Sequence, residues 1–235
     1  MKQILLIHGW NYRNYTGVTT ETDAWHNRSE FVENLSKEYE VYKLNLPGFC
    51  GEKEPPKAWD LDDYATYIHS YIQNNNINPD YILGYSFGGA VAITYHLKYG
   101  NKEKLILVSP AIIRNNDKSK KFVKTPKLFT KLRNYLRNTY IIHIVKTPEM
   151  VYGTKFLRDT YQIIVRKDLQ DEILKISPNN LLIIYGEKDD MVNPNKVINY
   201  LPEKYQSQIK VIKDGDHNIG KTHYKEIINI IKNNI

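Results

Sequence analysis

The sequence predicts an α/β protein with a mostly parallel sheet of about six strands, covered by helices on both faces. The first observation is that short, β-prone apolar runs alternate with helical periods along the chain. The second is the length of 235 residues, which suits one domain with an insertion and is long enough to bury a sizeable core. The third is a stretch, 111–176, in which the alternation stops and the pattern is helical throughout.

The individual elements follow from local patterns. Strands are expected at 3–7, 40–46, 80–85, 104–108, 181–185 and 209–213. Core helices are expected near 27–37, 61–74, 88–99, 194–200 and 221–233. Asp60 is expected to cap the helix at 61–74, whose apolar face carries Leu61, Tyr64, Ala65, Ile68 and Ile72. The last helix carries Tyr224, Ile227, Ile228 and Ile231 at helical spacing.

The helical stretch at 111–176 divides the chain. Thr147-Pro148-Glu149 has the form of a helix start with proline at the first position. One apolar stripe is formed by Leu128, Phe129, Leu132, Tyr135 and Leu136. We therefore predict a core domain of residues 1–110 and 177–235 and a helical insertion of residues 111–176.

The pentapeptide Gly84-Tyr85-Ser86-Phe87-Gly88 reads Gly-x-Ser-x-Gly and lies between a predicted strand and a predicted helix. A serine at such a sharp turn projects its hydroxyl above the sheet edge, beside the N–H of the next residue. The flanking glycines are needed because the turn is strained and the chain passes close to neighbouring backbone. Chance alone produces the pattern in roughly a tenth of chains of this length, so its weight depends on partner residues.

Partner residues follow other predicted strands. An acidic turn with Asp189 and Asp190 follows the strand at 181–185, and Asp214-Gly215-Asp216-His217 follows the strand at 209–213. The strand at 3–7 leads into His8-Gly9-Trp10. The chain order Ser, Asp, His, with each residue just after a strand, differs from the orders of chymotrypsin and subtilisin.

On these residues the chain resembles the α/β-hydrolase superfamily, and within it the small, lid-bearing esterase-like and C–C-hydrolase-like enzymes. The resemblance runs from about residue 3 to the C-terminus and is weakest in the middle third. It implies an α/β-hydrolase fold in which the helical insertion is a lid over the serine. The loop from Asn11 to Ala24 is longer than is usual in the family and leaves the shape of the pocket mouth open. The matching segments are His8-Gly9-Trp10, Leu46-Pro47-Gly48-Phe49, Gly84-Tyr85-Ser86-Phe87-Gly88-Gly89, Gly186-Glu187-Lys188-Asp189-Asp190-Met191-Val192 and Gly215-Asp216-His217.

The residues that acyl transfer requires can be assigned from this pattern. Ser86 is the expected nucleophile, and His217 is the expected base, because it alone follows the last strand in a Gly-Asp-His turn. Asp189 matches the family position of the acid that orients the histidine, and Asp190 is the alternative. The N–H groups of Trp10 and Phe87 are expected to form the oxyanion hole. His8 is assigned to the oxyanion loop, and structural roles are expected for His26, His69, His96, His143 and His223.

The expected function is hydrolysis of a small-molecule carboxylic ester or thioester through an acyl-serine intermediate. Cleavage of a carbon–carbon bond next to a ketone and an aminopeptidase-like amidase activity remain alternatives, as does a ligand-binding receptor that retains the triad. Serine at the turn between strand and helix argues against dehalogenase or epoxide-hydrolase chemistry, which uses an aspartate at this position of the fold. No metal-ligand cluster and no phosphate-binding glycine loop is evident in the sequence, so no cofactor is expected.

Composition indicates where the protein acts. The apolar runs of the sequence are too short to span a bilayer. The first predicted strand begins close to Met1, which leaves no room for a signal peptide. A cytoplasmic location is therefore expected. The single cysteine, Cys50, excludes an internal disulfide and is expected to be a bystander thiol.

Charge is concentrated in the predicted lid. It holds 15 of the 33 Lys and Arg residues and 6 of the 26 Asp and Glu residues, a local net charge of +9, and the remainder of the chain has a net charge of −2. A solvated face is the simpler interpretation, and contact with an anionic substrate or an acidic surface is the alternative. Nucleic acid is not expected as a partner. The excess is concentrated in Lys118, Lys120, Lys121, Lys124, Lys127 and Lys131.

Overall fold

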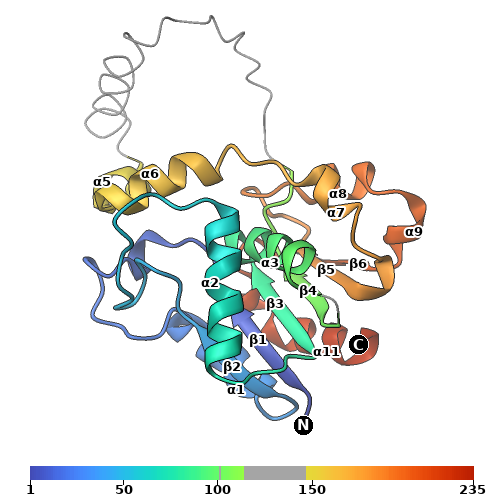
Figure 1. Ribbon diagram of the computed structural model, residues 1–235. Helices are drawn as coiled ribbons and strands as arrows, with labels where there is room; N and C mark the ends of the chain where they lie inside the picture. The colour runs from blue at the N-terminus through green and yellow to red at the C-terminus, as the bar shows by residue number, and fades with distance from the viewer. Residues whose placement is uncertain (101, 114–146) are drawn as a thin grey trace, which may run out of the picture.

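A computed structural model describes residues 1–100, 102–113 and 147–235, and in these ranges the chain forms one six-stranded sheet between two layers of helices (Figure 1). The strand order is β2-β1-β3-β4-β5-β6, and each neighbouring pair is parallel. This confirms the predicted fold class. The strands are β1 (Gln3–Ile7), β2 (Glu40–Leu44), β3 (Tyr81–Tyr85), β4 (Lys104–Val108), β5 (Leu181–Gly186) and β6 (Ile209–Ile212).

Both faces of the sheet are buried because the strands are apolar on both sides. In β1, Leu5 and Ile7 belong to one core cluster and Ile4 and Leu6 to the other, and all four are fully buried. The same alternation continues through β3, β4 and β5. A parallel sheet covered on both faces requires near-continuous apolar strands of this kind.

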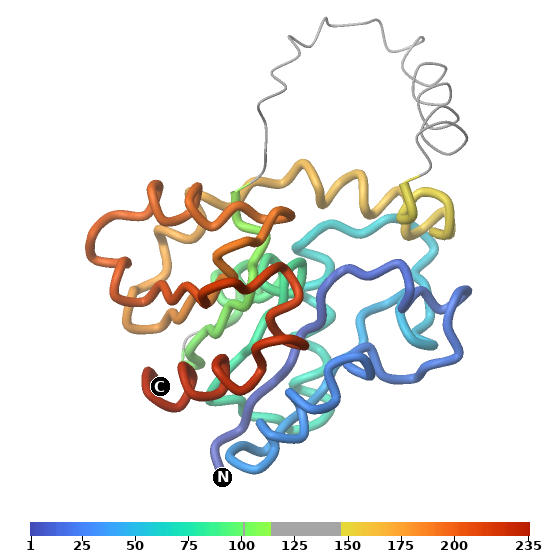
Figure 2. Tube along the Cα trace, turned by 180° about the vertical axis from the view of Figure 1, so that it is seen from behind, coloured from blue at the N-terminus to red at the C-terminus, as the bar shows by residue number. Residues whose placement is uncertain are grey.

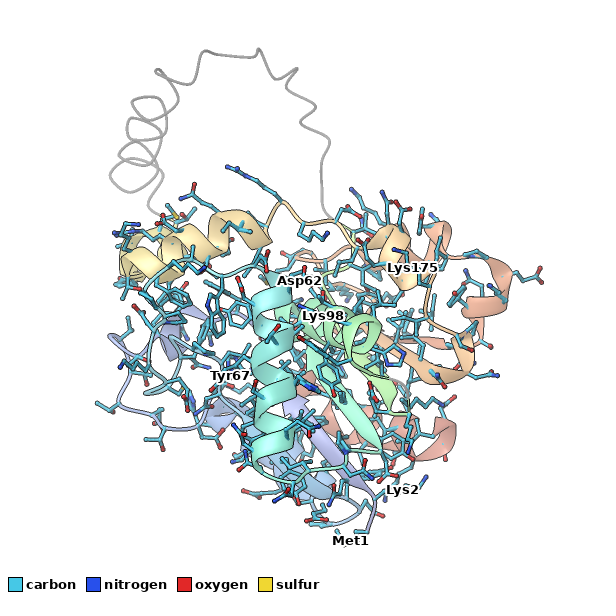
Figure 3. All side chains as sticks on the ribbon, in the orientation of Figure 1. Met1, Lys2, Asp62, Tyr67, Lys98 and Lys175 are labelled. Atoms are coloured by element: carbon cyan, nitrogen blue, oxygen red, sulfur yellow. The ribbon has the colours of Figure 1, made fainter. Side chains whose placement is uncertain are left out.

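The two helical layers differ in composition. On one face, α2 (Leu61–Asn74) packs against α3 (Phe87–Lys98), and the two are linked at the surface by an ion pair between Asp62 and Lys98 with a separation of 3.6 Å (Figure 3). On the other face, α1 (Ser29–Leu35) packs against α11 (Tyr224–Asn234), as the view from behind shows (Figure 2). The predicted cap of α2 is confirmed, because the Asp60 carboxylate accepts from the N–H of Asp63 and the Asp63 carboxylate accepts from the N–H of Asp60.

Shorter helices and turns complete the fold. The helices α5 and α6 cross above the sheet, and both chain termini lie on the opposite side of the molecule (Figures 1 and 2). Among the described residues, no helix combines the length and the apolar character needed to cross a membrane. The remaining helices are α5 (Pro148–Tyr152), α6 (Lys155–Ile164), α7 (Gln170–Ile173), α8 (Pro194–Tyr200), α9 (Glu203–Gln206) and α10 (Ile219–Thr222), with 3-10 turns η1 (Tyr12–Asn14), η2 (His26–Arg28) and η4 (Pro178–Asn180).

Several element ends differ from the sequence prediction for reasons of pairing. The predicted strand 40–46 ends at Leu44, because Leu44 pairs with Ile7, the last residue of β1. The predicted helix 221–233 is split into α10 and α11 at His223, whose backbone (φ −126°, ψ 28°) is not helical. The short helix α9 was not predicted, since four residues carry too little periodicity to be recognised.

Part of the predicted lid falls within the described residues. The predicted helix start at Thr147-Pro148-Glu149 is observed at α5, and α6 and α7 follow it. Residues 111–113 are not helical, and the Ile112 carbonyl accepts a hydrogen bond from the N–H of Leu169 (2.9 Å). The apolar stripe at 128–136, the six lysines at 118–131 and His143 lie outside the described residues. The division into a core and a lid at 111–176 stays a prediction.

Candidate active site

Ser86 occupies the turn between β3 and α3 in a backbone conformation that few residues adopt. Its φ of 52° and ψ of −111° lie outside the regions favoured by residues with a side chain. Two neighbouring segments hold this conformation. The N–H of Ser86 donates to the Val108 carbonyl (2.9 Å), and its own carbonyl accepts from the N–H groups of Gly89 (3.0 Å) and Ala111 (3.2 Å). The turn therefore presents the hydroxyl at the end of the strand where the helix begins.

The glycines on either side of Ser86 are required by close backbone approach. A Cβ on Gly84 would lie 2.5 Å from the carbonyl oxygen of Gly88, and a Cβ on Gly88 would lie 2.2 Å from the carbonyl oxygen of Ile7. No side chain fits at either position without moving the backbone. The expectation that the chain passes close to neighbouring backbone here is confirmed.

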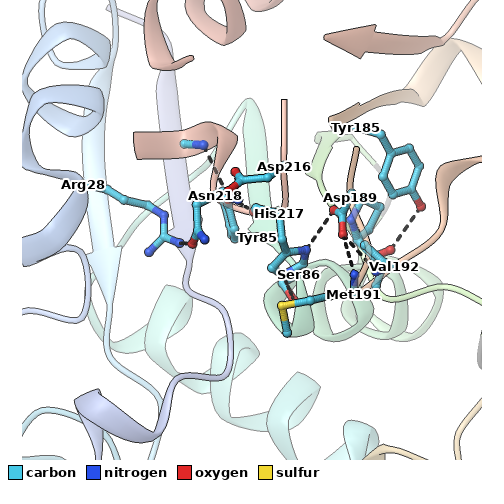
Figure 4. A network of polar contacts seen from close by, with 12 residues as sticks. Arg28, Tyr85, Ser86, Tyr185, Asp189, Met191, Val192, Asp216, His217 and Asn218 are labelled. Atoms are coloured by element: carbon cyan, nitrogen blue, oxygen red, sulfur yellow. Dashed lines mark hydrogen bonds and ion pairs between the residues drawn. The ribbon is translucent and has the colours of Figure 1, made fainter. Parts of the chain in front are cut away.

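Three side chains that are far apart in the sequence meet beside this turn (Figure 4). His217 Nε2 lies 3.0 Å from Ser86 Oγ, and His217 Nδ1 lies 2.8 Å from Asp189 Oδ2. An ionised carboxylate only accepts hydrogen bonds, so Nδ1 must carry the proton and donate to Asp189. Nε2 is then the free acceptor that faces the serine hydroxyl. This tautomer is the one in which a histidine can take a proton from Ser86.

Asp189 is held as a carboxylate by its surroundings. Its Oδ1 accepts hydrogen bonds from the N–H groups of Met191 (3.1 Å) and Val192 (2.9 Å). Burial opposes the charged form of Asp189, but the hydrogen bond and charge of His217 and the N–H of Val192 outweigh it and lower its pKa. Asp190 is exposed at the surface, and Asp189 is the acidic residue that contacts His217.

The aromatic residue before the serine supports the loop that carries the histidine. Tyr85 is 2% exposed, and its hydroxyl donates to the His217 carbonyl (2.6 Å) while accepting from the N–H of Gly220 (3.2 Å). These bonds tie the start of α10 to the end of β3. Tyr85 could not be recognised as functional from the sequence, because it occupies one of the two variable positions of the Gly-x-Ser-x-Gly pattern.

The loop predicted to supply the second oxyanion donor passes directly against Ser86. A Cβ on Gly9 would lie 3.3 Å from the Cβ of Ser86. The rings of Trp10 and Phe87 are in edge contact, with centroids 5.3 Å apart, so the two residues lie side by side at the site. Neither the N–H of Trp10 nor that of Phe87 donates to another described residue. Both donors are therefore available to an oxygen atom bound beside the serine.

His8 stabilises the same loop in a neutral form. Its Nε2 accepts from the N–H of Leu46 (3.0 Å), and its Nδ1 lies 2.8 Å from the Gly9 carbonyl, to which it donates. The side chain is buried, and this burial lowers the pKa of His8 from its usual value of 6.5 to about 4. Protonation would place a second donor against the Leu46 N–H and remove that hydrogen bond. His8 thus stabilises the loop that precedes Trp10.

We expect the free energy of unfolding to fall as the pH drops from 6.5 to about 4, because in this window the unfolded chain protonates His8 and the folded chain does not. The expected loss from this residue is about 3 kcal/mol. Urea denaturation at a series of pH values measures it. His8→Gln should remove this part of the pH dependence, and His69→Gln should retain it, since His8 is then intact. Equal slopes for the two variants would contradict this assignment.

Two cavities meet at Ser86. The larger, of about 590 Å³, is bounded by the loop at 11–24, the end of η2 and the loop after His217. The smaller, of about 190 Å³, lies beneath α6 and is lined by apolar side chains together with Ser86, Glu149 and His217. Its apolar walls are Phe87, Ala111, Tyr161, Ile164, Val165 and Val192. The long loop at 11–24 therefore forms one wall of the larger cavity. This role of the loop could not be predicted from the sequence.

Cys50 and the other described histidines lie away from this arrangement. Burial raises the pKa of the Cys50 thiol to about 11, so the thiol stays protonated at neutral pH. His69 stacks on Tyr99, with ring centroids 4.2 Å apart, and His96 lies 3.1 Å from the Glu103 carboxylate. Within the described part of the chain, no group of three or more His, Cys, Asp and Glu residues is placed to hold a metal ion.

Comparisons with known proteins point to one family. A family model described as an alpha/beta hydrolase fold matches residues 2–141. A protein of Synechocystis sp. that carries the name of a non-heme chloroperoxidase is 20% identical over 258 residues, which cover 98% of this chain and 90% of that protein.

Solved structures share the fold over nearly the whole chain. A meta-cleavage product hydrolase from Pseudomonas fluorescens superimposes with a TM-score of 0.62 at 19% identity, over 99% of this chain and 91% of that one. An esterase from Exiguobacterium antarcticum gives 0.63 at 17% identity, over 99% and 91%. A bromoperoxidase from Bacillus anthracis gives 0.63 at 17% identity, over 98% and 92%. At these identities the likeness establishes the fold and leaves the reaction open.

Proposed function

The chain belongs to the α/β-hydrolase fold family, and within it we propose a serine hydrolase that cleaves a carboxylic ester or thioester through an acyl-serine intermediate. The observation that carries the proposal is the hydrogen-bonded chain from Ser86 through His217 to Asp189. In this arrangement Ser86 is the nucleophile, His217 the general base and Asp189 the acid that orients it.

Acylation begins when His217 Nε2 accepts the hydroxyl proton of Ser86 and Oγ bonds to the substrate carbonyl carbon. The carbonyl oxygen becomes an oxyanion, and the N–H groups of Trp10 and Phe87 are the donors placed beside it. The imidazolium is stabilised by the Asp189 carboxylate. As the intermediate collapses, Nε2 gives its proton to the leaving oxygen or sulfur, and the alcohol or thiol departs.

Deacylation reverses the roles with water as the nucleophile. His217 Nε2 takes a proton from water, the hydroxide oxygen bonds to the acyl carbon, and the proton passes to Ser86 Oγ as the acid is released. The small cavity beneath α6 suits a small acyl group, since apolar side chains line part of it and its volume of about 190 Å³ is small for a ligand site. We therefore propose a preference for short acyl chains.

A substrate panel tests the proposal. We expect p-nitrophenyl acetate and butyrate to be hydrolysed with higher kcat/KM than the octanoate, because the longer chain exceeds the small cavity. A fluorophosphonate probe should label the protein once, and labelling should compete with ester turnover.

Other outcomes of the same panel would replace the proposal. Turnover confined to aminoacyl amides would indicate an amidase, and turnover confined to vinylogous diketones would indicate C–C bond hydrolysis. Labelling without turnover of any ester or thioester would favour a ligand receptor that retains the three residues.

A further inference from the structure

The larger cavity beside Ser86 contains an arginine that the mechanism above does not use. Arg28, at the end of η2, is half-buried, and its guanidinium carbon lies 4.4 Å from the centroid of the Tyr85 ring, over which it stacks. Among residues 1–100, 102–113 and 147–235, no carboxylate lies within ion-pair distance of Arg28. The positive charge is therefore held in place without a neutralising partner in the described structure.

Two neutral amides orient the guanidinium. Arg28 Nη1 donates to Asn27 Oδ1 (2.9 Å), and Nη2 donates to Asn218 Oδ1 (3.3 Å; Figure 4). Each terminal nitrogen of an arginine carries two N–H groups, so each retains one donor after these bonds. A pair of parallel donors on a planar group matches the two oxygens of a carboxylate or a phosphate. The N–H groups that remain after the two amide contacts are the donors available to such an anion.

Close packing restricts this orientation further. A Cβ on Gly220 would lie 2.7 Å from Cε2 of Tyr85 and 3.2 Å from Cδ of Arg28, so the absence of a side chain at Gly220 gives the arginine its place. The Nε of Arg28 is buried and has no hydrogen-bond partner among the described residues. Leaving a partly buried charge uncompensated is costly, and a bound anion would remove that cost.

The position of Arg28 relates it to one end of the substrate. The ring centroids of Tyr85 and His217 are 6.2 Å apart, and the guanidinium carbon of Arg28 lies 4.4 Å from the Tyr85 centroid. The guanidinium carbon of Arg28 therefore lies at most about 11 Å from the centroid of the His217 ring. Arg28 also lines an adjoining surface hollow of about 250 Å³ and is not among the residues around the small cavity beneath α6. Glu149 lines both cavities at Ser86, whereas Arg28, Lys221 and Asp216 line only the larger of the two.

We propose that Arg28 binds an oxyanion, a carboxylate or a phosphate, on the leaving group of the ester or thioester. This inference rests on the proposed serine hydrolase function. The leaving atom receives its proton from His217 Nε2, and the loop after His217 forms one wall of the larger cavity. With the acyl group in the small cavity beneath α6, the leaving group extends toward Asn218, Lys221 and Arg28. The substrate class is an ester or thioester of a small acyl group with an anionic alcohol or thiol.

Three acetate esters that share one acyl group test this inference: acetoxybutanoate, acetoxypropyl phosphate and the neutral acetoxybutanamide. We expect kcat/KM for at least one anionic ester to exceed that for the amide. Arg28→Gln should lower the anionic value about 10- to 100-fold, the loss typical of charge-assisted hydrogen bonds, and lower the neutral value far less. Arg28→Lys should recover only part of the loss, because it keeps the charge without the paired donors. The exposed Lys225→Gln serves as the control for a general change in charge.

The outcomes separate this inference from the function on which it rests. If the unmodified protein hydrolyses none of the three esters and no p-nitrophenyl ester, the hydrolase proposal fails. If acetoxybutanamide is hydrolysed as well as the anionic esters, or if Arg28→Gln slows all three equally, Arg28 supports Tyr85 and Asn218 and does not bind substrate. The preference between acetoxybutanoate and acetoxypropyl phosphate identifies the anion.

Discussion

Ser86→Ala is expected to reduce the kcat of ester hydrolysis by about a millionfold. The reason is that no other described nucleophile contacts His217 Nε2, so no acyl-enzyme can form once Oγ is removed. The measurement is the rate of p-nitrophenyl acetate hydrolysis together with labelling by a fluorophosphonate probe. Both should disappear in the same variant.

A matched serine substitution separates chemistry from folding. Ser70→Ala alters an exposed residue on α2 and should keep full turnover and labelling. The melting temperature of Ser86→Ala should stay within a few degrees of the parent, because the substitution removes one oxygen and keeps the Cβ. Undiminished labelling of Ser86→Ala would move the nucleophile to another residue.

Asp189→Asn is expected to lower kcat by about ten thousandfold. The asparagine amide would present an N–H to His217 Nδ1, which would then have to accept, and the proton would move to Nε2. In that tautomer the imidazole cannot take the proton of Ser86. Initial rates at saturating ester measure the effect, and binding of substrate should change much less than kcat.

The neighbouring carboxylate provides the control. Asp190→Asn removes the same charge one residue along the chain, from an exposed side chain, and should change kcat less than threefold. Since the two variants differ only in which carboxylate is lost, their ratio isolates the contact with His217. A larger loss in Asp190→Asn than in Asp189→Asn would reassign the orienting acid.

The sequence alone was sufficient for the features that depend on local pattern. The apolar runs located all six described strands within two residues of their observed ends, and Asp60 marked the start of α2. Ser86, Asp189 and His217 could be selected because each lies within four residues of the end of a predicted strand. Parallel strands end at the same edge of their sheet, so residues at those ends converge whatever their separation in the chain.

The tertiary structure decided what local pattern could not. Asp189 and Asp190 are adjacent in the chain, and only the path of the turn after β5 determines which one reaches His217. The contact of Arg28 with Asn218 joins residues 190 positions apart, and that of Tyr85 with the His217 carbonyl joins residues 132 apart. Neither pair lies within one helix or one strand, so no spacing in the sequence records it. These contacts exist because the core packing of the α1 and α11 layer brings η2, the end of β3 and the start of α10 together.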